Sequence, residues 1–137
     1  MTAWAQSLIR ISNYEVEARQ KRLAEVADRR RDAEMKLAMM EARGEAERLG
    51  TDQDPHSQMM LGAFLNGLKT RRAEAESEIA TITAEEEGAR DALTAAFEEL
   101  KKFEQVAEAT RLKRLAEANK RETAAFDEMG LRRQVQG

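Results

Sequence analysis

The fold of this chain depends on one short stretch, Gly50-Thr51-Asp52-Gln53-Asp54-Pro55-His56-Ser57. It holds the only proline and the only histidine, and it interrupts sequence that otherwise favours helix. A glycine commonly follows a helix end, because a residue without a Cβ adopts the left-handed conformation at little cost. Asp54 and Ser57 are good N-caps for a second helix, and proline is accepted in a first turn. One break between two long arms predicts a hairpin.

The composition agrees with this fold class. The 137 residues are 36% charged, 42% hydrophobic and 4% aromatic, which is typical of a coiled coil or long helix. We predict an all-α protein: a single two-helix antiparallel coiled-coil hairpin over residues 1–137. The first helix is expected at about 2–49, the turn at about 50–57, and a longer second helix at about 58–133.

Composition also excludes several functional classes. The absence of cysteine excludes disulfides, zinc–thiolate sites and thiol nucleophiles, and it is compatible with a reducing cytosol. No apolar run approaches the roughly 18–20 residues of a membrane span, and the first residues do not read as a signal peptide. A net charge of −3 does not favour nucleic-acid binding.

Both arms carry apolar residues at heptad spacing, which predicts the seam along which the arms pack. In the first arm the seam consists of Ile9, Val16, Leu23, Val26, Ala33, Leu37 and Met40, with Ser12, Arg19 and Arg30 as polar interruptions. In the second arm it consists of Leu61, Leu65, Leu68, Ala75, Ile79, Ile82, Ala89, Leu93, Ala96, Leu100, Phe103 and Ala107, interrupted by Arg72 and Glu86.

Charge matching predicts a register for the hairpin. A fold about residue 53 places residue i opposite roughly residue 106 − i, and opposite charges at flanking positions select such a register. The expected pairs set Arg29, Arg30 and Arg31 against Glu74, Glu76 and Glu78. They also set Arg19, Lys21 and Arg22 against Glu85, Glu86 and Glu87. Glu34 is expected near Arg72. The second arm then outruns the first after about Phe103. Because isolated helices are marginal in water, this overhang needs a partner or frays.

Two groups of apolar residues lie off the seam. Near the turn they are Met35, Met39, Met59, Met60 and Phe64. Exposed apolar area often marks an interaction site, and methionine suits an adaptable one; alternatively, the core widens here and includes them. At the open end they are Trp4, Leu8 and Ile11, which either enter a partner or, for Trp4, pack near Phe103.

No catalytic or metal-binding pattern is present in the sequence. His56 has no cysteine or paired acid near it, and adjacent residues such as Glu85, Glu86 and Glu87 point in different directions on a helix. The glycines form no phosphate-binding pattern. We therefore expect no enzyme, no metal and no cofactor.

Three stretches carry a resemblance to a known family. They are residues 7–11 with 17–24 (SLIRI and EARQKRLA), residues 60–68 (MLGAFLNGL) and residues 120–133 (KRETAAFDEMGLRR). Together they resemble the flagellar export protein family called FliJ, related in design to the stalk proteins of injectisome type III secretion. The chain departs from that pattern by lacking an aromatic after Arg133 and by having methionines near the turn.

The resemblance implies a soluble adaptor or stalk of the flagellar type III export apparatus, cytoplasmic and peripheral to the inner membrane at the flagellar base. Its implied partners are a hexameric export ATPase, the cytoplasmic domain of the export-gate membrane protein, and export chaperones. The expected ATPase-facing residues are Trp4, Leu8, Ile11, Leu112, Leu115, Lys120, Arg121, Phe126, Met129, Leu131, Arg132 and Arg133. The expected gate-docking residues are Met35, Met39, Met59, Met60, Phe64 and Leu68. The alternative is a structural coiled-coil protein that homodimerises through its C-terminal overhang.

Overall fold

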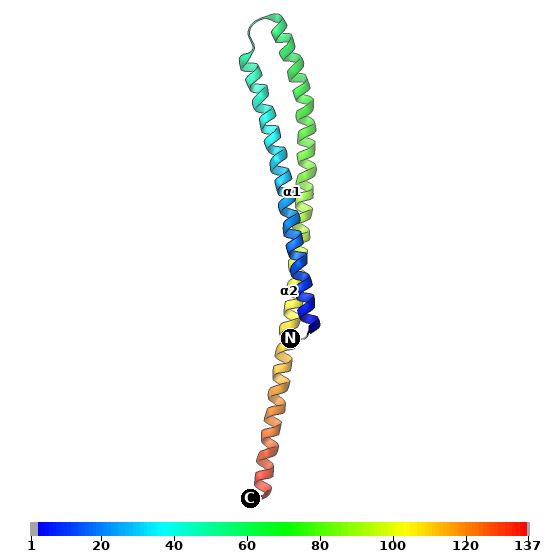
Figure 1. Ribbon diagram of the computed structural model, residues 1–137, viewed down its shortest axis with the longest axis vertical. Helices are drawn as coiled ribbons and strands as arrows, with labels where there is room; N and C mark the ends of the chain where they lie inside the picture. The colour runs from blue at the N-terminus through cyan, green and yellow to red at the C-terminus, as the bar shows by residue number, and fades with distance from the viewer. Residues whose placement is uncertain (1–2, 137) are drawn as a thin grey trace. The chain divides into compact units, whose positions relative to one another are not determined.

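A computed structural model describes residues 3–136, which form two helices, α1 (Ala3–Gly50) and α2 (Pro55–Gln136) (Figure 1). The described residues contain no strand, so the predicted all-α class with a longer second helix is confirmed. The expected start of the first helix at residue 2 lies outside the described residues. The second helix begins at Pro55 rather than near residue 58, and it continues to Gln136 rather than ending near residue 133.

The chain packs as two compact units. Unit 2 comprises residues 18–94, which include the turn and the arms beside it. Of the described residues, unit 1 comprises 3–17 together with 95–136.

The turn of unit 2 is short and is capped at its far end. The backbone N–H of Ser57 donates to the Asp54 carboxylate (3.2 Å), and the N–H of Gln58 donates to the Asp54 carbonyl (3.0 Å). Asp54 is therefore the N-cap of α2, with Pro55 at the first helical position, where no N–H is needed. The Thr51 hydroxyl donates to the Glu47 carbonyl (2.6 Å) and satisfies one of the last acceptors of α1.

The core of unit 2 is the predicted heptad seam. Val26, Leu68 and Ile82 are buried, Val26 completely. The other apolar seam positions in this unit are half-buried: Leu23, Ala33, Leu37, Met40, Leu61, Leu65, Ala75, Ile79, Ala89 and Leu93. Full burial of a side chain such as Val26 contributes about 1.5–3 kcal/mol. The seam prediction is confirmed.

The predicted register, by contrast, is wrong by about one heptad. Arg29 donates to Glu85 (2.7 Å) and Arg30 to Glu86, whereas the prediction set both arginines against Glu74–Glu78. Glu41, not Glu34, lies nearest Arg72 (3.6 Å). The expected approach of Arg22 to Glu85 is present, at 3.9 Å.

The linker accounts for the difference in register. Figure 1 shows residues 51–54 rising from the end of α1, so that the first turns of α2 project beyond it. Four linker residues can span up to about 13 Å, enough to cover the axial rise of about 10 Å that seven helical residues make. Because a seven-residue slip returns the same seam positions to the interface, it leaves the core unchanged.

Small residues make up most of the core of unit 1. Ala5, Ser12 and Val16 of α1 are buried, as are Ala96, Leu100 and Ala107 of α2. The half-buried Thr110 ends the covered part of α2 in this unit, about two turns beyond the expected limit near Phe103. From Arg111 to Val135 every residue is exposed. We call this stretch the overhang (residues 111–135).

Candidate docking surfaces

A polar layer crosses the seam of unit 2 and holds its two arms in one register. Arg30 donates through Nε to Glu86, whose side chain is only 10% exposed, and through Nη1 to Glu34 (3.0 Å). The hydrogen bond that Arg30 donates to Glu86, and then the one it donates to Glu34, raise the pKa of Arg30 above its ordinary value. Glu86 also accepts from Arg90 (3.4 Å). A polar position that must find its partner specifies register in a helical pair.

The off-seam methionines near the turn are exposed. Met35, Met39, Met59 and Met60 are 62%, 66%, 68% and 61% exposed, and Phe64 is half-buried. We call these five residues the tip surface. The alternative that a widened core covers the methionines does not hold in this structure. Leu68 is 4% exposed and belongs to the core, so it is not available on this surface.

One arginine connects the two helices across the tip surface. The guanidinium of Arg43 lies over the Phe64 ring, 5.7 Å from its centroid, which is the geometry of a cation–π contact. Arg43, Met60 and Phe64 line a hollow beside the turn. Met39 precedes Arg43 by four residues, and Met35 precedes Met39 by four, so these side chains follow one another along α1. Met39, Met60 and Phe64 therefore lie on the side of unit 2 that Arg43 marks, whereas Met35 is rotated by about 80° from Arg43 and Met59 by about 100° from Met60.

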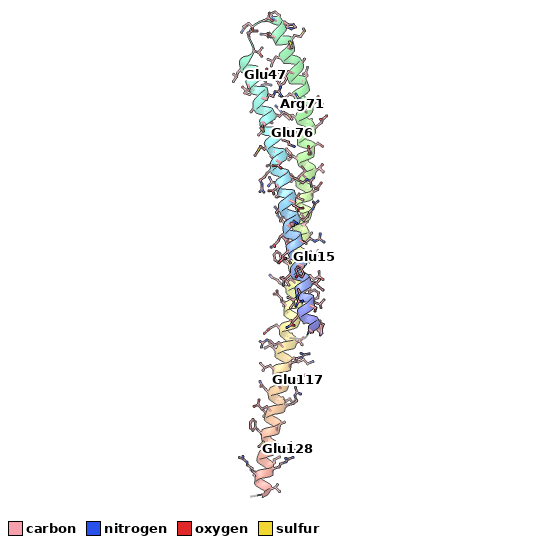
Figure 2. All side chains as sticks on the ribbon, in the orientation of Figure 1. Glu15, Glu47, Arg71, Glu76, Glu117 and Glu128 are labelled. Carbon is pink, nitrogen blue, oxygen red and sulfur yellow. The ribbon has the colours of Figure 1, made fainter. Side chains whose placement is uncertain are left out.

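The candidate residues of the open end lie in unit 1. Trp4 and Ile11 are 54% and 63% exposed, and Leu8 is half-buried. The structure leaves Trp4 largely in solvent instead of covering it with the second arm. The overhang carries further exposed apolar side chains: Leu112, Leu115, Phe126, Met129 and Leu131. Figure 2 shows Glu117 and Glu128 on a stretch of α2 with no second helix beside it.

Ion pairs within the helix stabilise the overhang locally. Arg111 pairs with Glu108 (2.7 Å) and Arg132 with Glu128 (3.3 Å), at spacings that place both partners on one helix face. The hydrogen bond from Arg111 lowers the pKa of Glu108, and the same bond raises the pKa of Arg111. The basic candidates Lys120, Arg121, Arg132 and Arg133 are all exposed.

Some exposed apolar residues were missed by the sequence analysis. They are Tyr14, Leu49, Phe97, Val106 and Val135. Tyr14 lines a shallow hollow with Ile9 and Arg10 in unit 1, and it follows Ile11 by three residues. Their exposure could have been predicted from the sequence, because these five apolar residues lie outside the heptad seam.

Residues 3–136 contain no group of three or more His, Cys, Asp or Glu side chains placed to hold a metal ion. His56 is exposed in the first turn of α2. Over the same residues, neither helix has a stretch long and apolar enough to cross a membrane.

The fold and surfaces define the class: an all-α helical-hairpin protein that presents apolar side chains near its turn and along an uncovered part of its longer helix. Comparison with known families narrows the class. The family described as the flagellar FliJ protein matches residues 5–136, and this chain belongs to that family.

Two relatives extend the match over the full length. Flagellar FliJ proteins of Caulobacter vibrioides, from strains NA1000 / CB15N and ATCC 19089 / CIP 103742 / CB 15, are each 46% identical over 137 residues. The alignment covers 100% of this chain and 99% of each relative. No solved structure matches the chain. The resemblance drawn from the sequence is confirmed.

Proposed function

We propose that this protein is an adaptor or stalk of the flagellar type III export apparatus, which binds its partners and has no catalytic chemistry of its own. The proposed partners are the hexameric export ATPase, the cytoplasmic domain of the export gate, and export chaperones. The proposed location is cytoplasmic, at the inner-membrane side of the flagellar base. Membership in the flagellar FliJ protein family supports the apparatus. The residue-level assignments rest on exposure.

The overhang is the proposed ATPase-binding element. The observation that carries this assignment is that every residue from Arg111 to Val135 is exposed, including four large apolar side chains on one face: Leu112, Leu115, Phe126 and Met129. Apolar area of this kind on a helix with no covering element is typical of a docking surface. Trp4 and Ile11 of unit 1 add further exposed apolar area to the proposed open-end contact.

The tip surface is the proposed gate-docking site. Its methionines are exposed and adaptable, and Arg43 adds a donor beside the Phe64 ring. A partner that seats an apolar or acidic side chain against Met60 and Phe64 would find both apolar contact and positive charge there. Leu68 supports this surface from the core and takes no direct part.

Binding to the ATPase tests the proposal first. The purified protein is expected to co-elute with the export ATPase and to increase its ring formation or ATP turnover. The control is a chain in which the overhang face is made polar by Leu112→Asp with Phe126→Asp. Unchanged turnover and separate elution of the unaltered protein would contradict the proposal.

A further inference from the structure

The exposed apolar and polar residues of the overhang follow a pattern that is symmetric about the middle of the overhang. A heptad line begins at Glu108, just before the overhang, and runs along the overhang through Leu112, Leu115, Asn119, Glu122, Phe126, Met129 and Arg133. All eight residues are exposed. A two-fold axis between Lys120 and Arg121 exchanges the two halves of this line. Leu112 then faces the Met129 position of a second copy, and Leu115 faces the Phe126 position.

The polar members of the line are complementary under the same axis. Glu108 meets Arg133, a carboxylate with a guanidinium. Asn119 meets Glu122, so an amide donor faces a carboxylate acceptor. Every position of the line therefore finds a suitable partner in an antiparallel copy. A parallel arrangement would set Glu122 against Glu122 and Arg133 against Arg133.

We infer that the overhang is a homodimerisation surface, on which a second copy of this chain packs antiparallel about the centre at residues 120–121. Apolar residues at heptad spacing on facing helices bury each other as knobs into holes. The polar layer of Asn119 and Glu122 at the centre fixes the register, as polar core positions do in helical pairs.

Charge along the overhang selects the antiparallel orientation. Residues 111–120 carry four basic side chains and one acidic, for +3, while residues 121–130 carry one basic and three acidic, for −2. An antiparallel pair lays the positive half of one copy on the negative half of the other. A parallel pair would place the two positive halves together and the two negative halves together, which is unfavourable.

The flanks of the line permit close approach. Residues beside it are small: Ala116, Ala118, Thr123, Ala125 and Gly130. The antiparallel pair contains one kind of like-charge approach, made twice by the two-fold axis, between Arg111 of each copy and Arg132 of the other. Each of these arginines is already paired within its own helix, with Glu108 and Glu128 respectively, which offsets the repulsion.

Residues 111–130 make about 30 Å of helix, close to three heptads, so the dimer is expected to be weak and concentration-dependent. The dimer does not rest on the proposed function. If the overhang also binds the ATPase, the dimer and the ATPase compete for the same face.

Sedimentation velocity of the full chain over a range of concentrations tests the dimer. The unaltered protein is expected to pass from monomer to dimer below about 1 mM, and Leu115→Glu to weaken the association at least about tenfold, because it buries a charge in the interface. Ala124→Glu, which adds the same charge on the outward side, is expected to leave association nearly unchanged. An unaltered chain that stays monomeric at about 1 mM, or a dimer indifferent to Leu115→Glu, would overturn the inference.

Cross-linking tests the register, and the absence of cysteine from the sequence makes single-cysteine variants unambiguous. Chains carrying Ala118→Cys are mixed with chains carrying Ala125→Cys and treated with a short thiol-reactive linker. The mixed product is expected to exceed the product that either variant forms with itself, because these positions face each other in the antiparallel pair. Equal or greater self-linking would contradict the antiparallel register.

Discussion

Gly44 faces Leu68 in unit 2, and the Leu68 side chain occupies the space that a Cβ on residue 44 would need. Gly44 is buried, and Leu68 is 4% exposed. Glycine in the middle of a helix costs about 0.5–1 kcal/mol relative to alanine. At this position, because glycine has no side chain, the two helices can approach each other closely.

Gly44→Ala therefore tests the packing of unit 2. We expect a loss of about 1–3 kcal/mol in the free energy of unfolding, because the buried Leu68 must leave its position. Gly67→Ala is the matched control, since nothing lies within 4 Å of a Cβ there, and it should gain up to about 1 kcal/mol from helix propensity. Chemical denaturation followed by circular dichroism measures both. An equal gain for the two variants would contradict the described contact.

Leu68 also shows why individual site residues were harder to predict than the seam. The residue lies on the heptad seam and within the apolar stretch that resembles the family, so the sequence supports both roles. Only packing separates them: Leu68 is buried, whereas Met60 in the same stretch is 61% exposed.

The register of α1 and α2 within unit 2 belongs to the scale of the elements. Heptad spacing predicted which residues face inward, because that spacing follows from helix geometry alone. It could not predict the register, since a slip of one heptad restores the same seam. The deciding features are the four-residue linker at residues 51–54 and the pairing of Arg30 with Glu86. Arg30 and Glu86 were both recognised from the sequence as polar interruptions of the seam, but the sequence did not show that they pair with each other.

A charge exchange tests this register. Arg30→Glu alone should destabilise the protein by about 1–3 kcal/mol, because it sets a second carboxylate beside the largely buried Glu86. Adding Glu86→Arg should recover a large part of that loss. Adding Glu76→Arg, the partner that a fold about residue 53 would give, should not. Thermal unfolding of the three variants measures the difference, and recovery with Glu76→Arg would contradict the described pairing.

At the scale of the whole molecule, the sequence was sufficient to predict the two-helix fold, the longer second helix and the family. It left open whether the off-seam methionines are exposed or belong to a widened core, and the structure shows them exposed. The extent of the overhang was predicted less well, because it depends on the register: the covered part of α2 ends at Thr110 rather than near Phe103. Which surface binds which partner stays a prediction.

The central claim is that two separate surfaces serve two partners, and one paired binding measurement tests it directly. Binding of the export ATPase and of the gate's cytoplasmic domain is measured for two variants: Met60→Ser with Phe64→Ser on the tip surface, and Leu112→Asp with Phe126→Asp on the overhang. Because all four residues lie outside the two cores, both variants should keep nearly unaltered helicity. We expect the first variant to lose at least about tenfold in gate affinity while binding the ATPase normally, and the second to do the reverse. Equal effects of both variants on both partners, or no effect of either, would contradict the account.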